Sequence, residues 1–212
     1  MAKLKESVIG VLSGKIGQVV GATWKGISVL KVLPGSVAQP QTLPQLTQRA
    51  KFKAIMAFLQ PLSEFLQKGF KSYAIGMTGI NAAMAYNLKN ALAGTYPAYT
   101  IDYPNALVSR GNLASALNQA AASTIAGTIA FTWDDNSGEI GASALDKTLI
   151  VVYNPLKHQA VTISELAARG DGTQTITMPG SFTGDQVQCF MAFINAAGEL
   201  SNSAFAGAVT VV

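Results

Sequence analysis

The part of the sequence that follows Tyr96 alternates between short strand-like segments and clusters of turn-forming residues. The clusters DDNSGE, YNPLK, RGDG, PGSFTGD and NAAGELSN are rich in Gly, Pro, Asn and Asp, the residues that tight turns favour. Short segments rich in Val, Ile, Thr and aromatic residues, regularly interrupted by such turns, are typical of a β-sandwich. We therefore expect residues 96–212 to form a β-sandwich domain. Its expected strands are 100–110, 123–133, 149–153, 173–178, 186–195 and 206–212.

The start of the chain has the pattern of a β-hairpin. Residues 16–24 and 27–33 are rich in Val, Ile, Thr and Trp, and the Lys25-Gly26 pair between them suits a short turn in which glycine tolerates positive φ. Three glycines lie in or next to the first strand, where glycine weakens pairing or marks the close approach of another backbone. The pattern fits an ordinary hairpin with imperfect strands, or a hairpin that exposes an edge to a neighbouring subunit.

Two helices are expected between the hairpin and the sandwich. Apolar residues at alternating spacings predict a helix that starts after Thr42, is kinked or split by Pro61 and ends at Gly69. A second, alanine-rich helix is expected over residues 79–92. We expect these helices and the hairpin to form one compact α/β unit, residues 1–95. The apolar stripe of the first helix consists of Phe52, Ile55, Leu59, Leu62 and Leu66, and Phe58 and Phe65 widen it.

Charged residues are scarce and unevenly distributed. They make up 12% of the chain, about half the usual quarter, and surfaces of this kind are common where subunits are buried in assemblies. Residues 1–75 carry a net charge of +8, whereas residues 76–212 carry −4. The basic part could attract an anionic partner or meet the acidic part of another copy. Solvated lysines without any partner would give the same net charges.

The sequence contains no constellation of residues that predicts catalysis. The glycine and lysine pattern near Gly14 resembles a phosphate-binding loop, but one residue too few separates Gly10 from Gly14 and an isoleucine follows Lys15 in place of the required hydroxyl residue. His158 is the single histidine and lies in an expected loop without partners for a triad or a metal site. Cys189 is the single cysteine and is expected to be a buried apolar residue. We therefore expect no enzymatic activity, no cofactor and no metal.

The acidic loop DDNSGEIGASALD raises the question of a cation site. Asp134, Asn136 and Gly138 fall where an EF-hand loop begins, but Leu145 stands where that loop needs its bidentate glutamate. A turn that joins two strands is therefore the favoured interpretation, with calcium as the alternative. RGDG, at residues 169–172, is interpreted as a turn sequence that arises by chance.

Nucleic acid and membrane are not expected partners. The basic cluster of Arg49, Lys51 and Lys53 is accompanied by no helix-turn-helix, zinc or RNA-binding signature. The apolar run near the N-terminus is too short for a secretory signal, and the uncharged span 111–133 contains many Asn, Gln, Ser and Thr residues. These features favour a virion, or a particle assembled in the cytoplasm, over a secreted protein.

Three segments resemble strands of fibronectin type III-like domains: IAFTWDDNSG, LIVVYNP and QVQCFMAFINAAGELSNS. The resemblance implies that Trp133 on strand B and Tyr153 on strand C fill the core of the sandwich, and that the last segment forms the F and G strands. A single cysteine allows no disulfide between the sheets, which fits fibronectin type III domains better than antibody domains.

The whole chain also resembles a group of small uncharacterised proteins of Bacteroidota and their phages. The resemblance rests on SGKIGQVVGATWKG and on PQTLPQLTQRAKF, in which Pro40, Thr42, Gln45, Arg49 and Phe52 follow a pattern similar to one in phage virion proteins. It implies no known activity and favours a structural role.

The sequence thus predicts an α+β protein with an N-terminal β-hairpin and helices, followed by an Ig-like, fibronectin type III-like β-sandwich. The favoured function is a non-catalytic, self-associating component of a virion or surface structure, whose partners are copies of itself or other structural proteins. The alternative is a binding module whose sandwich loops engage a glycan or a host protein. The residues expected to make assembly contacts are Gly14, Gly17, Gly21, Trp24, Lys25, Ile27, Val29 and Arg49.

Overall fold

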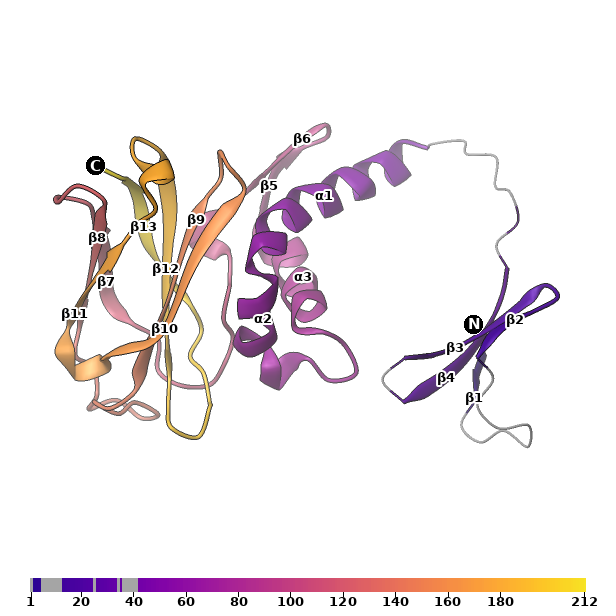
Figure 1. Ribbon diagram of the computed structural model, residues 1–212, viewed down its shortest axis with the longest axis horizontal. Helices are drawn as coiled ribbons and strands as arrows, with labels where there is room; N and C mark the ends of the chain where they lie inside the picture. Colours follow the sequence, from indigo (N-terminus) through magenta and orange to yellow (C-terminus); the bar gives the residue numbers. More distant parts are fainter. Residues whose placement is uncertain (1, 5–12, 25, 34, 36–41) are drawn as a thin grey trace. The chain divides into compact units, whose positions relative to one another are not determined.

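The computed structural model describes residues 2–4, 13–24, 26–33, 35 and 42–212, and the chain divides into two compact units, Met1–Thr42 and Leu43–Val212 (Figure 1). This division differs from the expected one after residue 95. The hairpin forms a unit without the helices, and the helices belong with the sandwich because they share a hydrophobic core with it.

The Met1–Thr42 unit contains an antiparallel sheet with the strand order β1-β4-β3-β2. Its centre is the hairpin of β3 (Val19–Trp24) and β4 (Ile27–Val32), which confirms the predicted hairpin. The expected first strand is shorter than predicted, because a turn at Gly17, whose φ is 59°, separates β2 from β3. The two edge strands are β2 (Gly14–Ile16), which pairs with β3, and β1 (Ala2–Leu4), which pairs with β4.

The Leu43–Val212 unit contains a β-sandwich of two antiparallel sheets, with strand orders β11-β8-β7 and β10-β9-β12-β13. The facing sides of the two sheets enclose a core that includes Trp133, Cys189 and Phe193, so the predicted burial of Trp133 and Cys189 is confirmed. The strands are β7 (Leu117–Ala122), β8 (Thr128–Asp134), β9 (Lys147–Asn154), β10 (Gln159–Ala168), β11 (Thr173–Thr177), β12 (Gln186–Ile194) and β13 (Ala204–Thr210).

The helices follow the sequence prediction closely. The proline at position 61 ends α1 (Leu43–Leu59), and the 3-10 turn η1 (Gln60–Leu62) connects it to α2 (Ser63–Gly69). After η2 (Lys71–Tyr73), Thr78 caps α3 (Gly79–Asn90): its hydroxyl accepts a hydrogen bond of 3.3 Å from the backbone N–H of Asn81.

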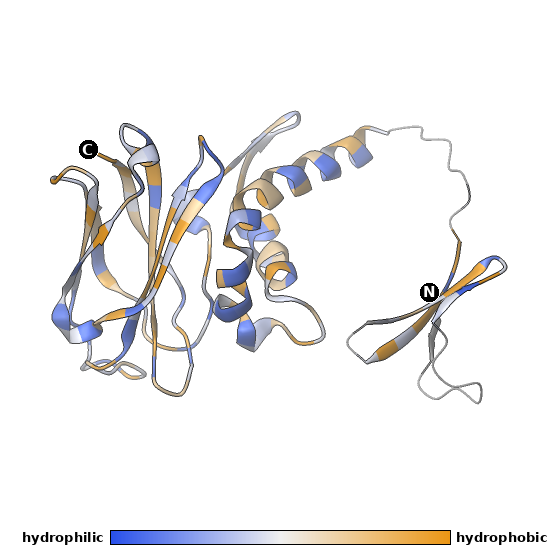
Figure 2. Cartoon of the chain, in the orientation of Figure 1, coloured by the Kyte–Doolittle hydropathy of each residue, from blue (hydrophilic) through white to orange (hydrophobic). Residues whose placement is uncertain are grey.

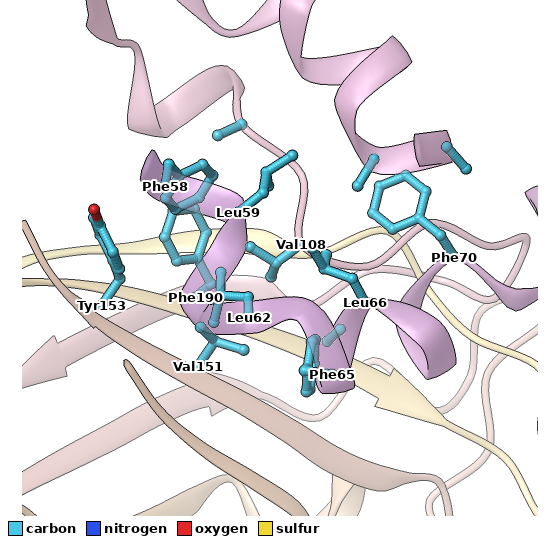
Figure 3. Packing of buried hydrophobic residues seen from close by; sticks show 14 of the residues in the cluster. Phe58, Leu59, Leu62, Phe65, Leu66, Phe70, Val108, Val151, Tyr153 and Phe190 are labelled. Atoms are coloured by element: carbon cyan, nitrogen blue, oxygen red, sulfur yellow. The ribbon is translucent and has the colours of Figure 1, made fainter. Parts of the chain in front are cut away.

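A second core joins these helices to the outer face of the four-stranded sheet (Figure 3). Phe58 from α1, Leu62 from η1 and Leu66 from α2 are buried against residues of β9 and β12. Successive side chains of a strand point to opposite faces, so β9 and β12 contribute to both cores and are buried on both sides. This double burial accounts for the unbroken apolar runs LIVVY and CFMAFI, because a strand covered on both faces needs apolar residues at every position.

Tyr153 corrects one expectation: it lies in the second core and not inside the sandwich. Its ring packs edge-on against Phe58, with 5.0 Å between the ring centroids. Its hydroxyl donates to the backbone carbonyl oxygen of Ala57 at 3.4 Å and lies 3.1 Å from Nδ1 of His158. Burial raises the pKa of Tyr153 to about 12. The side chain therefore fixes α1 to the sheet.

Two further expectations differ from the structure. The strand expected at 100–110 is limited to β6 (Ala98–Ile101), which forms a short hairpin with β5 (Leu92–Thr95). The chain then passes through η3 (Tyr103–Asn105), where Pro104 provides no N–H for a sheet. The edge strands β7 and β10 were not predicted, although they pair along β8 and β9.

The loops at the ends of the strands contain the short turns η4 (Arg169–Asp171) and η5 (Gly180–Phe182). Phe182 extends from η5 into the sandwich, where its side chain is buried in the core between the sheets.

We expect residues 43–212 to fold alone, whereas residues 96–212 should aggregate. Removal of the helices from the sandwich exposes the apolar outer face of β9 and β12, which Tyr153 and Phe190 help to form. Circular dichroism melting of the two fragments checks this prediction. A cooperative, soluble 96–212 fragment would show that the helices are dispensable.

Phe58→Ala should lower the free energy of unfolding by about 3–5 kcal/mol, because the ring is buried and its loss leaves a cavity. Phe52→Ala is the matched control on the same helix, since its side chain is 46% exposed, and it should change stability by less than about 0.5 kcal/mol. Urea unfolding of both variants in the 43–212 fragment provides the measurement, and equal effects would contradict the assignment of the second core.

Candidate functional site

The faces of the N-terminal sheet differ in charge. Residues opposite one another on neighbouring strands lie on the same face. The pairs Ile16↔Val19 and Val19↔Val32 therefore define one face, which continues through Gly21 and Leu30 and carries no charge in its described part. We call it the uncharged face. The opposite face contains Lys15, Val20, Ala22, Ile27, Val29 and Lys31.

Three apolar side chains of the uncharged face are exposed, whereas Leu30 on the same face is half-buried and Gly21 is buried. Ile16 is 67% exposed, Val19 39% and Val32 69%. Among the described residues of this unit no apolar side chain is buried, although Figure 2 shows apolar residues along its strands. A sheet gains stability by burying an apolar face, and the described residues of this unit provide no such contact for Ile16, Val19 and Val32.

The residues expected to make assembly contacts fall at different places. Gly14 and Gly21 pair with each other on the uncharged face, whereas Ile27 and Val29 lie on the opposite face. Gly14 has φ of 111°, so backbone conformation explains this glycine, and no described atom approaches the place of its missing side chain. The remaining residues of the hairpin set are Gly17 in the turn, Trp24 at the end of β3, and Lys25, which lies outside the described residues.

Arg49 belongs to the other unit and lines a groove on α1. The groove has a volume of about 550 Å³, and its walls also include Phe52, Lys53 and Met56. A neighbouring hollow of about 410 Å³ is bounded by Ala57, Gln60, Pro61 and His158. The exposed half of α1 thus combines apolar side chains with cations, which the sequence had indicated through its Arg49, Lys51 and Lys53 cluster.

Neither His158 nor Cys189 belongs to a metal-binding cluster in the part of the chain that the structure describes. No group of three or more His, Cys, Asp or Glu side chains is close enough there to hold a metal ion. His158 is engaged with Tyr153. Cys189 is buried, and burial raises the pKa of its thiol to about 12, so it remains protonated and unreactive at neutral pH. No described helix is long and apolar enough to span a membrane.

The acidic loop is held by a buried ion pair. Arg169 is fully buried, and its guanidinium donates to Oδ2 of Asp146 at 3.2 and 3.1 Å and to Oδ1 of Asn136 at 2.6 Å. It also donates to the backbone carbonyl oxygen of Ala114 and lies 3.8 Å from the centroid of the Phe193 ring. Asn136, one of the candidate calcium ligands, thus already accepts a hydrogen bond from Arg169. Arg169 is also the first residue of RGDG, so this residue has a structural role in the fold.

Asp146→Ala should lower the free energy of unfolding by about 3–5 kcal/mol, because Arg169 would keep its buried charge without a counterion. Glu64→Gln, at an exposed position on α2, should have an effect below about 0.5 kcal/mol. Urea unfolding measures both variants. If Asp146→Ala unfolds like the wild type, the pair does not stabilise the loop.

Comparisons with known proteins give a family and a distant structural neighbour. No curated protein matches the chain. A solved structure, the fn3 domain of human collagen alpha-1(XX) chain, is 14% identical with a TM-score of 0.37, and the match covers 47% of this chain and 87% of that one. A family model described as "Family of unknown function (DUF6266)" matches residues 11–207. The chain therefore belongs to the DUF6266 family.

Proposed function

We propose that the protein is a non-catalytic structural component that self-associates through the uncharged face of its N-terminal sheet. In this proposal the protein serves in a particle such as a virion or a surface structure, in which the Leu43–Val212 unit is displayed. The observation that carries the proposal is the exposure of Ile16, Val19 and Val32, on a sheet whose described residues include no buried apolar side chain.

The size of the N-terminal unit supports this proposal. It comprises residues 1–42, which is close to the size of about 40 residues below which domains usually need a disulfide, a metal or oligomerisation to be stable. The single cysteine lies elsewhere in the chain. Burial of apolar surface stabilises by about 25 cal/mol per Å², so covering the uncharged face would supply the missing stability.

The charge distribution favours a second copy of the same sheet as the partner. The described lysines of β2 and β4, Lys15 and Lys31, lie on the opposite face. Two uncharged faces can therefore stack without bringing these lysines together, as the inner faces of a sandwich do. Such a contact uses the same surface on both subunits, which is the commonest arrangement in homo-oligomers.

Val19→Asp should convert the assembled protein to a monomer, because stacking would bury two unpaired carboxylates. Lys31→Gln, on the opposite face, is the matched control and should leave the oligomer intact. Size-exclusion chromatography with light scattering, at low and high salt, gives the mass of each variant. Association through apolar faces should survive high salt, whereas association between the basic and acidic parts of two copies should weaken.

The 43–212 fragment should be monomeric in the same experiment. A monomeric full-length protein, or an oligomer that Val19→Asp leaves unchanged, would overturn the proposal. Circular dichroism melting of each variant shows whether the Leu43–Val212 unit remains folded.

A further inference from the structure

We propose that a pocket around Arg110 binds a small organic carboxylate with an apolar or aromatic body. The pocket lies wholly within the Leu43–Val212 unit, at the junction of the helices and the sandwich. It has a volume of about 450 Å³, and its walls include Tyr73, Ala82, Tyr86 and Lys89. The inference does not depend on self-association, because it uses no residue of the N-terminal sheet.

The backbone that presents Arg110 is fixed on both sides. Its N–H donates to the backbone carbonyl oxygen of Gly69 at the end of α2, at 2.8 Å. Asn87 of α3 makes two hydrogen bonds with the backbone of Leu107, of 2.9 and 3.0 Å. On the sandwich side, the hydroxyl of Ser203 accepts from the N–H of Val108 at 2.9 Å. A segment held in this way places the arginine with little freedom, which reduces the entropy cost of binding.

Two aromatic rings hold the arginine side chain. The guanidinium carbon lies 4.1 Å from the centroid of the Tyr73 ring and 5.2 Å from that of Tyr86. Both distances are in the range of cation–π contacts. Tyr73 comes from η2 and Tyr86 from α3, so separate elements fix the position of the charge.

The guanidinium has no polar partner among the described residues. Neither the hydrogen bonds nor the ion pairs of this part of the chain involve its side-chain nitrogens. The buried Arg169 shows the contrast, since its guanidinium bonds to Asp146, Asn136 and a backbone carbonyl. Arg110 therefore keeps its N–H donors available in a half-buried position.

The walls of the pocket determine the class of ligand. No Asp or Glu is among its lining residues, and Lys89 provides a second cation, so an anion is favoured. The planar fork of an arginine matches the two oxygens of a carboxylate. Ala82 and Met77, together with the tyrosine rings, offer apolar surface for the rest of the molecule. The volume is within the range of small-molecule sites, about 300–1,000 Å³.

Calorimetric titration of the full chain with phenylacetate tests the inference, and the neutral isostere phenylacetamide is the matched ligand control. Phenylacetate should bind, and Arg110→Gln should weaken its binding at least about tenfold. Arg110→Lys should give an intermediate affinity, because lysine retains the charge but not the fork. Lys147→Gln, which removes an exposed cation outside the pocket, should leave the affinity unchanged.

Thermal unfolding of Arg110→Gln shows whether the fold is retained. If that variant unfolds early, Lys89→Gln at an exposed position of α3 replaces it, and weaker binding of phenylacetate is expected there too. Titration with inorganic phosphate should give weaker binding than phenylacetate. Equal binding of phenylacetate and phenylacetamide, tighter binding of phosphate, or an affinity that neither Arg110→Gln nor Lys89→Gln changes would overturn the proposal.

Discussion

Burial of β9 and β12 on both faces is the constraint on which the rest of the Leu43–Val212 unit depends. One face of these strands packs inside the sandwich through residues such as Val152 and Met191, and the other packs under the helices through Val151 and Phe190. A sheet with two apolar faces cannot leave either one in water at this size. The helices are therefore a third layer of the fold, which is why the unit extends from residue 43 to residue 212.

The N-terminal unit has an apolar sheet face without such a cover among its described residues. Its central strands β3 and β4 also carry apolar residues, yet no described part of the chain covers Ile16, Val19 or Val32. In the larger unit, the cover for an apolar sheet comes from the same chain. The N-terminal sheet needs a cover from outside its described residues, and this difference links the fold to the proposed function.

Local signals made much of this fold predictable. Pro61 ends α1, and Thr78 and Gly79 begin α3, because these residues act on their own neighbourhood. The side to which Tyr153 points could not be predicted, since it depends on which face of β9 the helices cover. The edge strand β10 was harder to recognise, because Val161 and Ile163 alternate with exposed residues only as far as Ser164, and the exposed Glu165 and Leu166 then interrupt the alternation.

The candidate sites, too, could be predicted only where they depend on local sequence patterns. Sequence reasoning indicated the hairpin and Arg49, which lie in recognisable local patterns. It missed Arg110, because Tyr73, Tyr86 and the segment that carries the arginine meet only in the folded chain.

The position of the Arg110 pocket links ligand binding to the stability of the fold. A ligand that contacts residues of η2, α3 and the connecting segment would favour the docked helices, and at a concentration 100 times its Kd it would add about 2.7 kcal/mol to the stability. Binding at the junction would thus strengthen the contact on which the three-layered unit depends.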